Sequence, residues 1–117
     1  YPYHLWNNQK KEILSGNSGK KVETYAPDII HQKALSFIED NKDSPFFMYY
    51  ASPLPHLPLQ APKADVDKYR KILGEEEPYL GNDSYFPNRY PRATYAAMIT
   101  YLDRQLGELI KKLKEKE

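Results

Sequence analysis

The last third of the chain carries the most regular pattern of hydrophobic and polar positions. Between residues 91 and 114, large apolar residues recur at alternating steps of four and three, which places them on one stripe of a helix. The pattern predicts a long amphipathic helix over residues 91–114 that buries Tyr95, Ile99, Leu102, Leu106 and Leu109. The lysines at the end of this segment, between residues 111 and 116, are interpreted as a solvated helix end whose positive charge complements the negative end of the helix dipole.

Two shorter helices are predicted upstream. Pro27 suits the first turn of a helix and Asp28 lies at its positive end, and apolar residues then recur at helical spacing until the polar cluster 41–44 stops the helix. A second helix is expected from Ala64 to Leu73, with a glycine directly after it as a C-terminal stop.

The most apolar stretch of the chain, residues 45–52, predicts a strand. It has the length and richness of a strand covered on both faces. Proline cannot donate to a strand ladder, so the prolines of residues 53–62 force the chain out of the sheet. This proline-rich loop carries His56, which is therefore expected at the carboxyl end of the strand, where open α/β sheets place ligand-contacting loops.

Residues 1–24 and 75–91 lack a consistent period and are interpreted as irregular. Asn7 and Asn8 have turn chemistry, and Leu5 and Trp6 are expected to anchor the first stretch to the core. His4 and His31 have no partner at metal-ligand spacing, so each is interpreted as a surface or half-buried histidine. One further loop is rich in residues that suit a sugar-contacting surface, although loop solubility explains them equally well: Tyr79, Asn82, Tyr85, Asn88 and Tyr90.

Composition limits the function classes. The chain of 117 residues is about one domain, and 17 basic against 16 acidic residues give a formal charge of +1. No broad field would therefore steer nucleic acid or an anionic membrane, and no apolar run reaches the roughly 20 residues that span a bilayer. We expect neither nucleic acid nor a membrane as a partner. The absence of cysteine excludes a disulfide framework and a thiolate metal site within these residues.

Four stretches, in this order, resemble the sulfatase family. Tyr25-Ala26-Pro27-Asp28 opens the first helix, and Asn41-Lys42-Asp43-Ser44 leads into the apolar run. The run and its loop fit the pattern PFFxYxxxxxPHxP, in which the histidine at the position of His56 contacts the sulfate group. The last is the long-helix segment 95–107, which reads YAAMITYLDRQLG. The ordered set is more specific than any one stretch.

The resemblance implies an arylsulfatase-like hydrolase of sulfate esters with an α/β, alkaline-phosphatase-like fold. In that fold the strand belongs to a large sheet, so here we expect a helix-rich partial layer with one central buried strand. We interpret the chain as a single internal fragment with four parts: an irregular lead-in at 1–24, a helix, strand and proline-rich loop at 25–62, a short helix and loop at 63–90, and the long helix at 91–117. Unpaired strand edges would make it marginal, or lead it to oligomerise or swap elements.

The resemblance also implies cofactors, partners and a location. Sulfatases use calcium and a formylglycine made in a C/S-x-P/A-x-R motif, and this sequence has neither that motif nor the paired acidic residues that hold the calcium. We therefore expect no cofactor bound within the chain and no activity from the chain alone. The expected substrate is a sulfated small molecule or glycan, and the expected location is periplasmic, secreted or lysosomal.

His56 is the catalytic and substrate-binding candidate. An imidazole can donate a hydrogen bond to a sulfate oxygen as charge shifts toward the leaving oxygen, or it can deliver a proton, and the sequence does not separate these roles. The alternative function is a non-catalytic α/β interaction module that presents Pro55-His56-Leu57-Pro58 as a polyproline II ligand.

Overall fold

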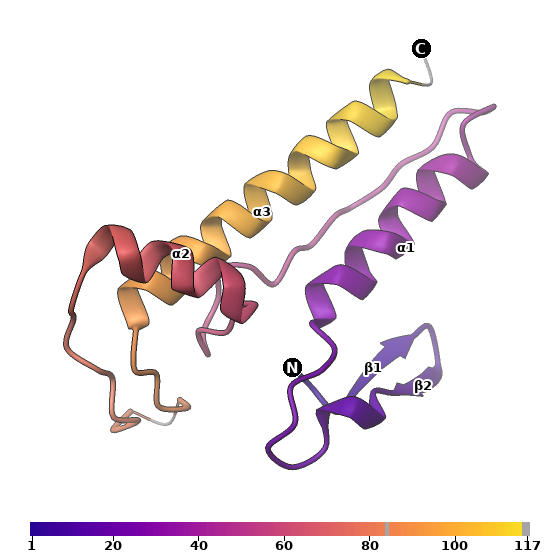
Figure 1. Ribbon diagram of the computed structural model, residues 1–117. Helices are drawn as coiled ribbons and strands as arrows, with labels where there is room; N and C mark the ends of the chain where they lie inside the picture. Colours follow the sequence, from indigo (N-terminus) through magenta and orange to yellow (C-terminus); the bar gives the residue numbers. More distant parts are fainter. Residues whose placement is uncertain (84, 116–117) are drawn as a thin grey trace.

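The computed structural model describes residues 1–83 and 85–115. Its elements, in chain order, are β1 (His4–Asn7), β2 (Lys10–Ile13), the short 3-10 helix η1 (Ser15–Asn17), α1 (Ala26–Asp40), α2 (Lys63–Leu73) and α3 (Pro91–Lys114). Figure 1 shows the three helices and the small hairpin that these elements form. The expected helix-rich α/β character is confirmed in this coarse form, with three helices and a two-stranded sheet among the described residues.

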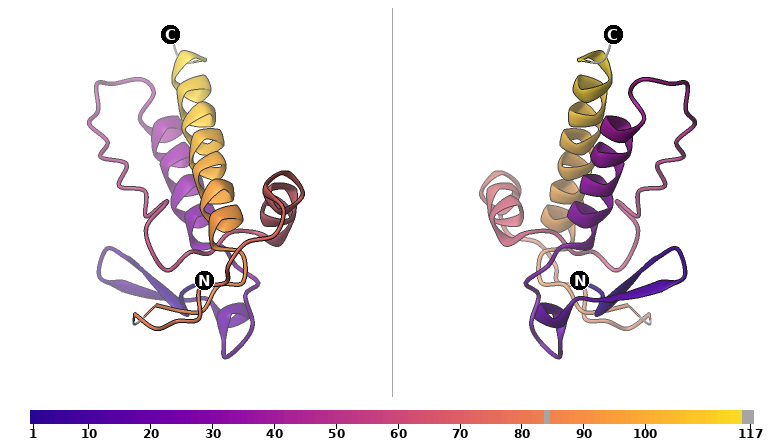
Figure 2. Two further views of the ribbon diagram at one scale, coloured as in Figure 1. Left: turned by 90° about the vertical axis from the view of Figure 1, so that its left-hand side faces the viewer. Right: turned by 90° about the vertical axis from the view of Figure 1, so that its right-hand side faces the viewer.

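The core lies between α1 and α3, which run side by side in both Figure 1 and Figure 2. One buried cluster joins Ala34 and Ile38 of α1 to Leu109 of α3. A second cluster forms where the loops meet the first half of α3, and it contains Tyr25, Leu54, Met98 and Tyr101. Removing these side chains from water is the main favourable contribution to the fold.

The predicted helix boundaries are confirmed. α3 spans Pro91–Lys114, as its periodicity predicted, and α2 ends at Leu73 before Gly74, whose φ of 72° is the left-handed conformation that favours glycine at a helix end. α1 has Pro27 in its first turn and Asp28 close behind it. Local signals were sufficient here because caps and periodicity act within one or two turns.

The predicted buried face of α3 is wrong for most of its residues. Leu109 is buried as expected and Leu102 is partly buried, but Tyr95, Ile99 and Leu106 are exposed. The buried face instead carries Ala93, Thr94, Ala97, Met98, Tyr101, Gln105 and Leu109. The alanines allow close packing, and the polar members are buried because they form hydrogen bonds, which a pattern of large apolar residues does not reveal.

The central strand expected over residues 45–52 is not observed, and this prediction is corrected. The segment runs along α1 and α3 in Figure 1, but within the described part of the chain no strand pairs with it. Met48 and Tyr50 pack toward the buried cluster of α1 and α3, whereas Phe47 and Tyr49 are 87% and 83% exposed. Successive side chains therefore alternate between a covered and an exposed face, as they do in a strand. A β-strand also requires backbone hydrogen bonds to a neighbouring strand.

The N-terminal stretch is more ordered than expected. β1 and β2 form an antiparallel hairpin in which Asn7 pairs with Lys10, and the turn residue Asn8 has a φ of 55°, a conformation that asparagine tolerates. The turn was recognised in the sequence and the strands were not. Trp6 is exposed, so its expected role as a core anchor is wrong, while Leu5 is half-buried.

Candidate functional site

The proline-rich loop is held in place by a buried leucine. Leu54 belongs to the core cluster with Tyr25 and Met98, and its backbone N–H donates to the Ser52 hydroxyl at 3.2 Å. Two residues further on, the His56 N–H donates to the Pro53 carbonyl at 2.9 Å and closes a tight turn. The loop is therefore anchored on one side while it presents His56 to solvent on the other.

The orientation of the His56 imidazole follows from one hydrogen bond. Its Nδ1 lies 2.7 Å from the Leu57 carbonyl oxygen. Because a carbonyl only accepts hydrogen bonds, this geometry assigns the proton to Nδ1. Nε2 is then the nitrogen left for a ligand. It accepts a hydrogen bond when the ring is neutral and donates one when the ring is protonated.

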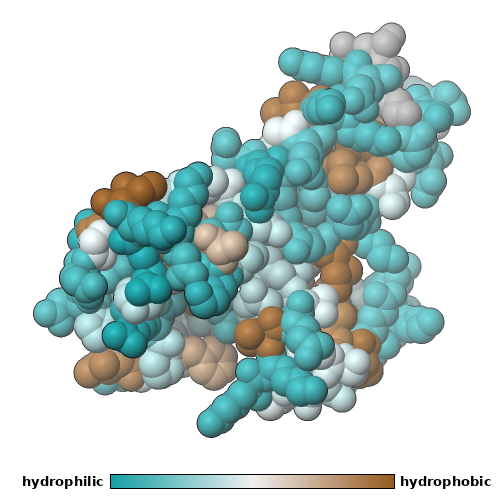
Figure 3. All heavy atoms as spheres, in the orientation of Figure 1, coloured by the Kyte–Doolittle hydropathy of each residue, from teal (hydrophilic) through white to brown (hydrophobic). Residues whose placement is uncertain are grey.

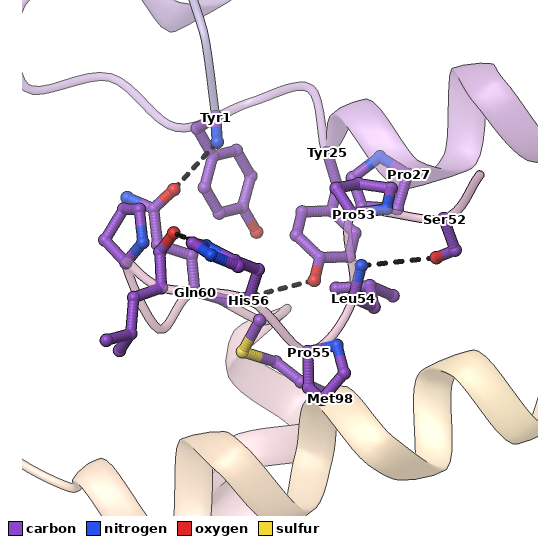
Figure 4. Close-up of a pocket in the computed structure, with 12 residues that line it drawn as sticks. Tyr1, Tyr25, Pro27, Ser52, Pro53, Leu54, Pro55, His56, Gln60 and Met98 are labelled. Carbon is purple, nitrogen blue, oxygen red and sulfur yellow. Dashed lines mark hydrogen bonds between the residues drawn. The ribbon is translucent and has the colours of Figure 1, made fainter.

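His56 lines a pocket of about 690 Å³ between the proline-rich loop, the start of α1 and α3. Figure 4 shows His56, Gln60, Tyr25 and Met98 around this space. The Tyr25 hydroxyl donates to the Gln60 carbonyl at 2.8 Å, and burial raises the pKa of Tyr25 well above its ordinary value of 10.0, so the phenol stays neutral. Among the described residues that line the pocket there is no acidic side chain. An anion beside His56 would therefore meet no carboxylate repulsion from these walls.

The other two histidines have different surroundings. His4 is half-buried, as expected, with its ring edge-on to Trp6 at 6.0 Å between centroids. The expectation that His31 lies at the surface or is half-buried is wrong, because its residue is only 3% exposed between α1 and α3. Its Nε2 lies 2.7 Å from Glu108 Oε2. Helix packing, which periodicity alone does not reveal, places this ring inside.

The residues of the 79–90 loop that suggested a sugar-contacting surface have three different kinds of surroundings. The Asn88 amide donates to the Leu59 carbonyl at 3.0 Å, and the Tyr90 ring lies under the Arg70 guanidinium at 3.7 Å. These two side chains are occupied by contacts within the protein. Tyr79 and Tyr85 line a second cavity beside the loop, whereas Asn82 is exposed.

The described residues do not fit the cofactors that the resemblance implied. Within 1–83 and 85–115 there is no group of three or more His, Cys, Asp or Glu side chains placed to hold a metal ion. The sequence has no cysteine, and none of its serines begins the motif from which formylglycine is made. No chemistry of this chain is therefore assigned to calcium or to formylglycine.

A model of the sulfatase family matches residues 2–117, so the chain belongs to the sulfatase family. The match covers the helices α1 and α3 together with the loop that presents His56. In the described part of the chain, no helix combines the length and the apolar character needed to cross a bilayer.

Proposed function

We propose that this protein acts in the hydrolysis of sulfate esters and that His56 contacts the sulfate group. Membership of the sulfatase family supports the reaction class. The observation that carries the residue assignment is the imidazole geometry: Nδ1 is held by the Leu57 carbonyl at 2.7 Å, and the exposed ring borders a pocket without acidic walls. Such a ring needs little reorganisation before it meets an anion.

The proposed role of His56 is to stabilise charge at the reacting ester. In the protonated ring, Nε2–H donates to a sulfate oxygen or to the leaving oxygen as the S–O bond breaks. Transfer of that proton to the leaving oxygen is the second role open to the same nitrogen. In both roles Nδ1–H stays bonded to the Leu57 carbonyl, so Nε2 is the nitrogen that meets the ester.

The chain by itself is expected to be inactive. It offers no residue that fits the formylglycine motif and no described group of ligands for calcium, so the nucleophile of the reaction is not among its residues. The purified chain, assayed with an aryl sulfate, is expected to give no turnover above that of a His56→Ala sample. Turnover that exceeds this control and is free of host enzyme would contradict the expectation.

The alternative, a module that presents Pro55-His56-Leu57-Pro58 to a partner, has less support. A polyproline II ligand lies along its groove as a solvated, extended segment. In this loop Leu54 is buried in the core and the His56 N–H closes a turn onto the Pro53 carbonyl. The segment is therefore built into the domain. The sulfated partner, as a small molecule or glycan, and the periplasmic, secreted or lysosomal location remain part of the proposal.

The decisive experiment uses an active sulfatase that contains this chain. His56→Ala is expected to lower kcat for a sulfate ester by about 100-fold or more, as for the loss of one positioned charge-stabilising donor. His4→Ala, at a half-buried histidine that does not line the pocket, is the matched control and is expected to leave kcat unchanged. An unchanged kcat in His56→Ala, measured per folded molecule, would remove His56 from the site.

A further inference from the structure

The end of the proline-rich loop is held by two side chains that lie far away in sequence. The Gln60 carbonyl accepts a hydrogen bond from the Tyr25 hydroxyl at 2.8 Å, and the preceding Leu59 carbonyl accepts one from the Asn88 amide at 3.0 Å. Both carbonyls follow His56 closely in the same loop. We call Tyr25 and Asn88 the loop tethers.

The first tether, Tyr25, is held by the core. Its residue is 6% exposed and lies directly before α1. Its ring packs edge-on against Tyr101 at 5.1 Å between centroids, and the Tyr101 hydroxyl donates to the Asp28 carboxylate. Figure 4 shows Tyr25 between the start of α1 and the proline-rich loop. Because the ring is buried among packed side chains, the position of its hydroxyl is fixed.

The second tether, Asn88, is held by its own loop. Its side-chain oxygen accepts from the Tyr90 N–H at 2.8 Å. Its backbone forms an isolated antiparallel bridge with Tyr79, with N–H to carbonyl distances of 2.8 and 2.9 Å. The loop lies at the lower left in Figure 1, and the space-filling view in Figure 3 shows it packed against the body of the molecule. Both the oxygen and the nitrogen of the Asn88 side chain are therefore used within the protein.

The tethers limit the direction of the Leu57 carbonyl, which accepts the hydrogen bond from His56 Nδ1 at 2.7 Å. Only Pro58 separates this residue from the tethered Leu59. The proline ring fixes φ of Pro58, and the backbone of a residue before proline is restricted as well. Upstream, the burial of Leu54 fixes the other end of the loop. Few backbone rotations remain free between the two fixed ends, so the acceptor of the His56 ring stays in place.

We propose that Tyr25 and Asn88 are positioning residues for the sulfate contact. By holding the Leu57 carbonyl, they keep the proton on Nδ1 of His56 and leave Nε2 for the ester. Preset geometry lowers the reorganisation that a charge-stabilising donor needs, and small displacements of such a donor lower the rate steeply. This inference rests on the proposed function of His56. If the tethers only stabilised the fold, their loss would lower the melting temperature and leave the His56 ring unchanged.

The first experiment determines the His56 tautomer in the 117-residue chain from the nitrogen chemical shifts of its ring, measured by NMR. The spectrum is recorded at about pH 8.5, where an ordinary histidine is neutral, and the signal that disappears in His56→Ala is assigned to this ring. The parent chain is expected to show the Nδ1–H tautomer. Tyr25→Phe removes one hydroxyl, and Asn88→Asp removes the donor but keeps the acceptor for Tyr90. Each variant is expected to shift the ring toward a mixture with the Nε2–H tautomer.

Tyr69→Phe is the matched control. It also removes one tyrosine hydroxyl, whose hydrogen-bond partner is Thr100 of α3, outside the proline-rich loop. The control is expected to lower the melting temperature by an amount similar to Tyr25→Phe and to keep the Nδ1–H tautomer of His56. Tether variants that keep the tautomer of the parent chain would overturn the proposal. A parent chain with the proton on Nε2 would also overturn it, because the Leu57 carbonyl then accepts no hydrogen bond from the ring.

The second experiment measures kcat and KM in an active sulfatase that contains this chain. Tyr25→Phe is expected to lower kcat by about tenfold and to leave KM within about twofold of the parent value. Because the tether acts through His56, adding Tyr25→Phe to His56→Ala is expected to cause no further loss. A loss of the same size that persists in the His56→Ala background would overturn the positioning role and leave the proposed function standing. If His56→Ala itself leaves kcat unchanged, the proposed function fails and the positioning role in catalysis fails with it, whatever the tautomer.

Discussion

His31 and His56 each form one hydrogen bond through a ring nitrogen, but they differ in the surroundings of the other ring nitrogen. His31 is buried between α1 and α3, with Nε2 bound to Glu108, and its Nδ1 finds no hydrogen-bond partner in the described part of the chain. His56 is exposed, with Nδ1 bound to the Leu57 carbonyl and Nε2 open to a pocket. Each ring therefore makes one hydrogen bond through a ring nitrogen. In the buried His31 this bond supports the fold, whereas in the exposed His56 the second ring nitrogen is accessible to a ligand.

In the His31 region, polar side chains of α1, α3 and the segment between α1 and α2 form hydrogen bonds with one another. The Tyr101 hydroxyl donates to the Asp28 carboxylate, and the Gln105 amide donates to the Pro27 carbonyl at 3.2 Å. Tyr50 in turn donates to the Gln105 side-chain oxygen at 3.2 Å. The network links α1, the extended segment and α3, which explains why α3 buries a partly polar face. The His56 region instead combines the buried Leu54 anchor with two hydrogen bonds to Gln60, from the Tyr25 hydroxyl and from the Tyr1 amino group, each at 2.8 Å.

The largest expected effect lies in the apolar centre of the helix pair. Ile38 is 0% exposed and Ile99 is 42% exposed, so the same change can be made on a buried and on an exposed isoleucine. Ile38→Ala is expected to lower the free energy of unfolding by about 2 to 4 kcal/mol, because it leaves a cavity. Ile99→Ala is expected to cost less than about 1 kcal/mol. Denaturant unfolding of both variants measures the difference, and equal losses would show that Ile99 of α3 is packed as tightly as Ile38 of α1.

The ion pair at His31 gives a smaller effect. Glu108→Ala is expected to lower the free energy of unfolding by about 1 kcal/mol, because the buried His31 ring then loses its one hydrogen bond. Glu115→Ala, at the exposed end of α3 and paired with Lys111 at 3.8 Å, is the control and is expected to cost less than about 0.5 kcal/mol. If the two variants unfold at the same denaturant concentration, the contact between Glu108 and His31 contributes nothing to stability.

The tyrosine network predicts how stability depends on pH. Burial, followed by the hydrogen bond to Asp28, raises the pKa of Tyr101 above its ordinary value of 10.0. The unfolded chain therefore ionises Tyr101 first, so its contribution to stability is complete below pH 10 and is lost as the pH rises further. Tyr101→Phe is expected to weaken this alkaline loss in melting temperature. Tyr3→Phe, at an exposed tyrosine, is the control, and a Tyr101→Phe curve that keeps the full alkaline loss would contradict the assignment.

The smallest expected effect on stability is at His56. Its side chain is exposed and its polar contact within the protein is with the neighbouring Leu57 carbonyl, so His56→Ala is expected to change the free energy of unfolding by less than about 0.5 kcal/mol. The melting temperature of the same preparation used for activity measures this. A large drop would mean that His56 supports the fold as His31 does, and the contrast between the two regions would disappear.

Residues near in sequence determined the parts of this protein that were predicted correctly. The bounds of α3, the glycine after α2 and the turn at Asn8 follow from periodicity, capping and backbone preference, which act over a few residues. The family and the loop that carries His56 followed from ordered motifs in the sequence, and the match over residues 2–117 confirms the family. The role of His56 stays a prediction.

Only the tertiary structure decided the face of α3, the burial of His31, the lack of a pairing strand beside residues 45–52 in the described part of the chain, and the contact between the 79–90 loop and the proline-rich loop. Each depends on a partner far away in sequence: Gln105 meets the Pro27 carbonyl, His31 meets Glu108, and Asn88 meets the Leu59 carbonyl. A hydrophobicity pattern ranks side chains by their own transfer free energy, whereas burial of a polar group depends on whether packing supplies its hydrogen-bond partner. That supply is set by how the helices and loops meet.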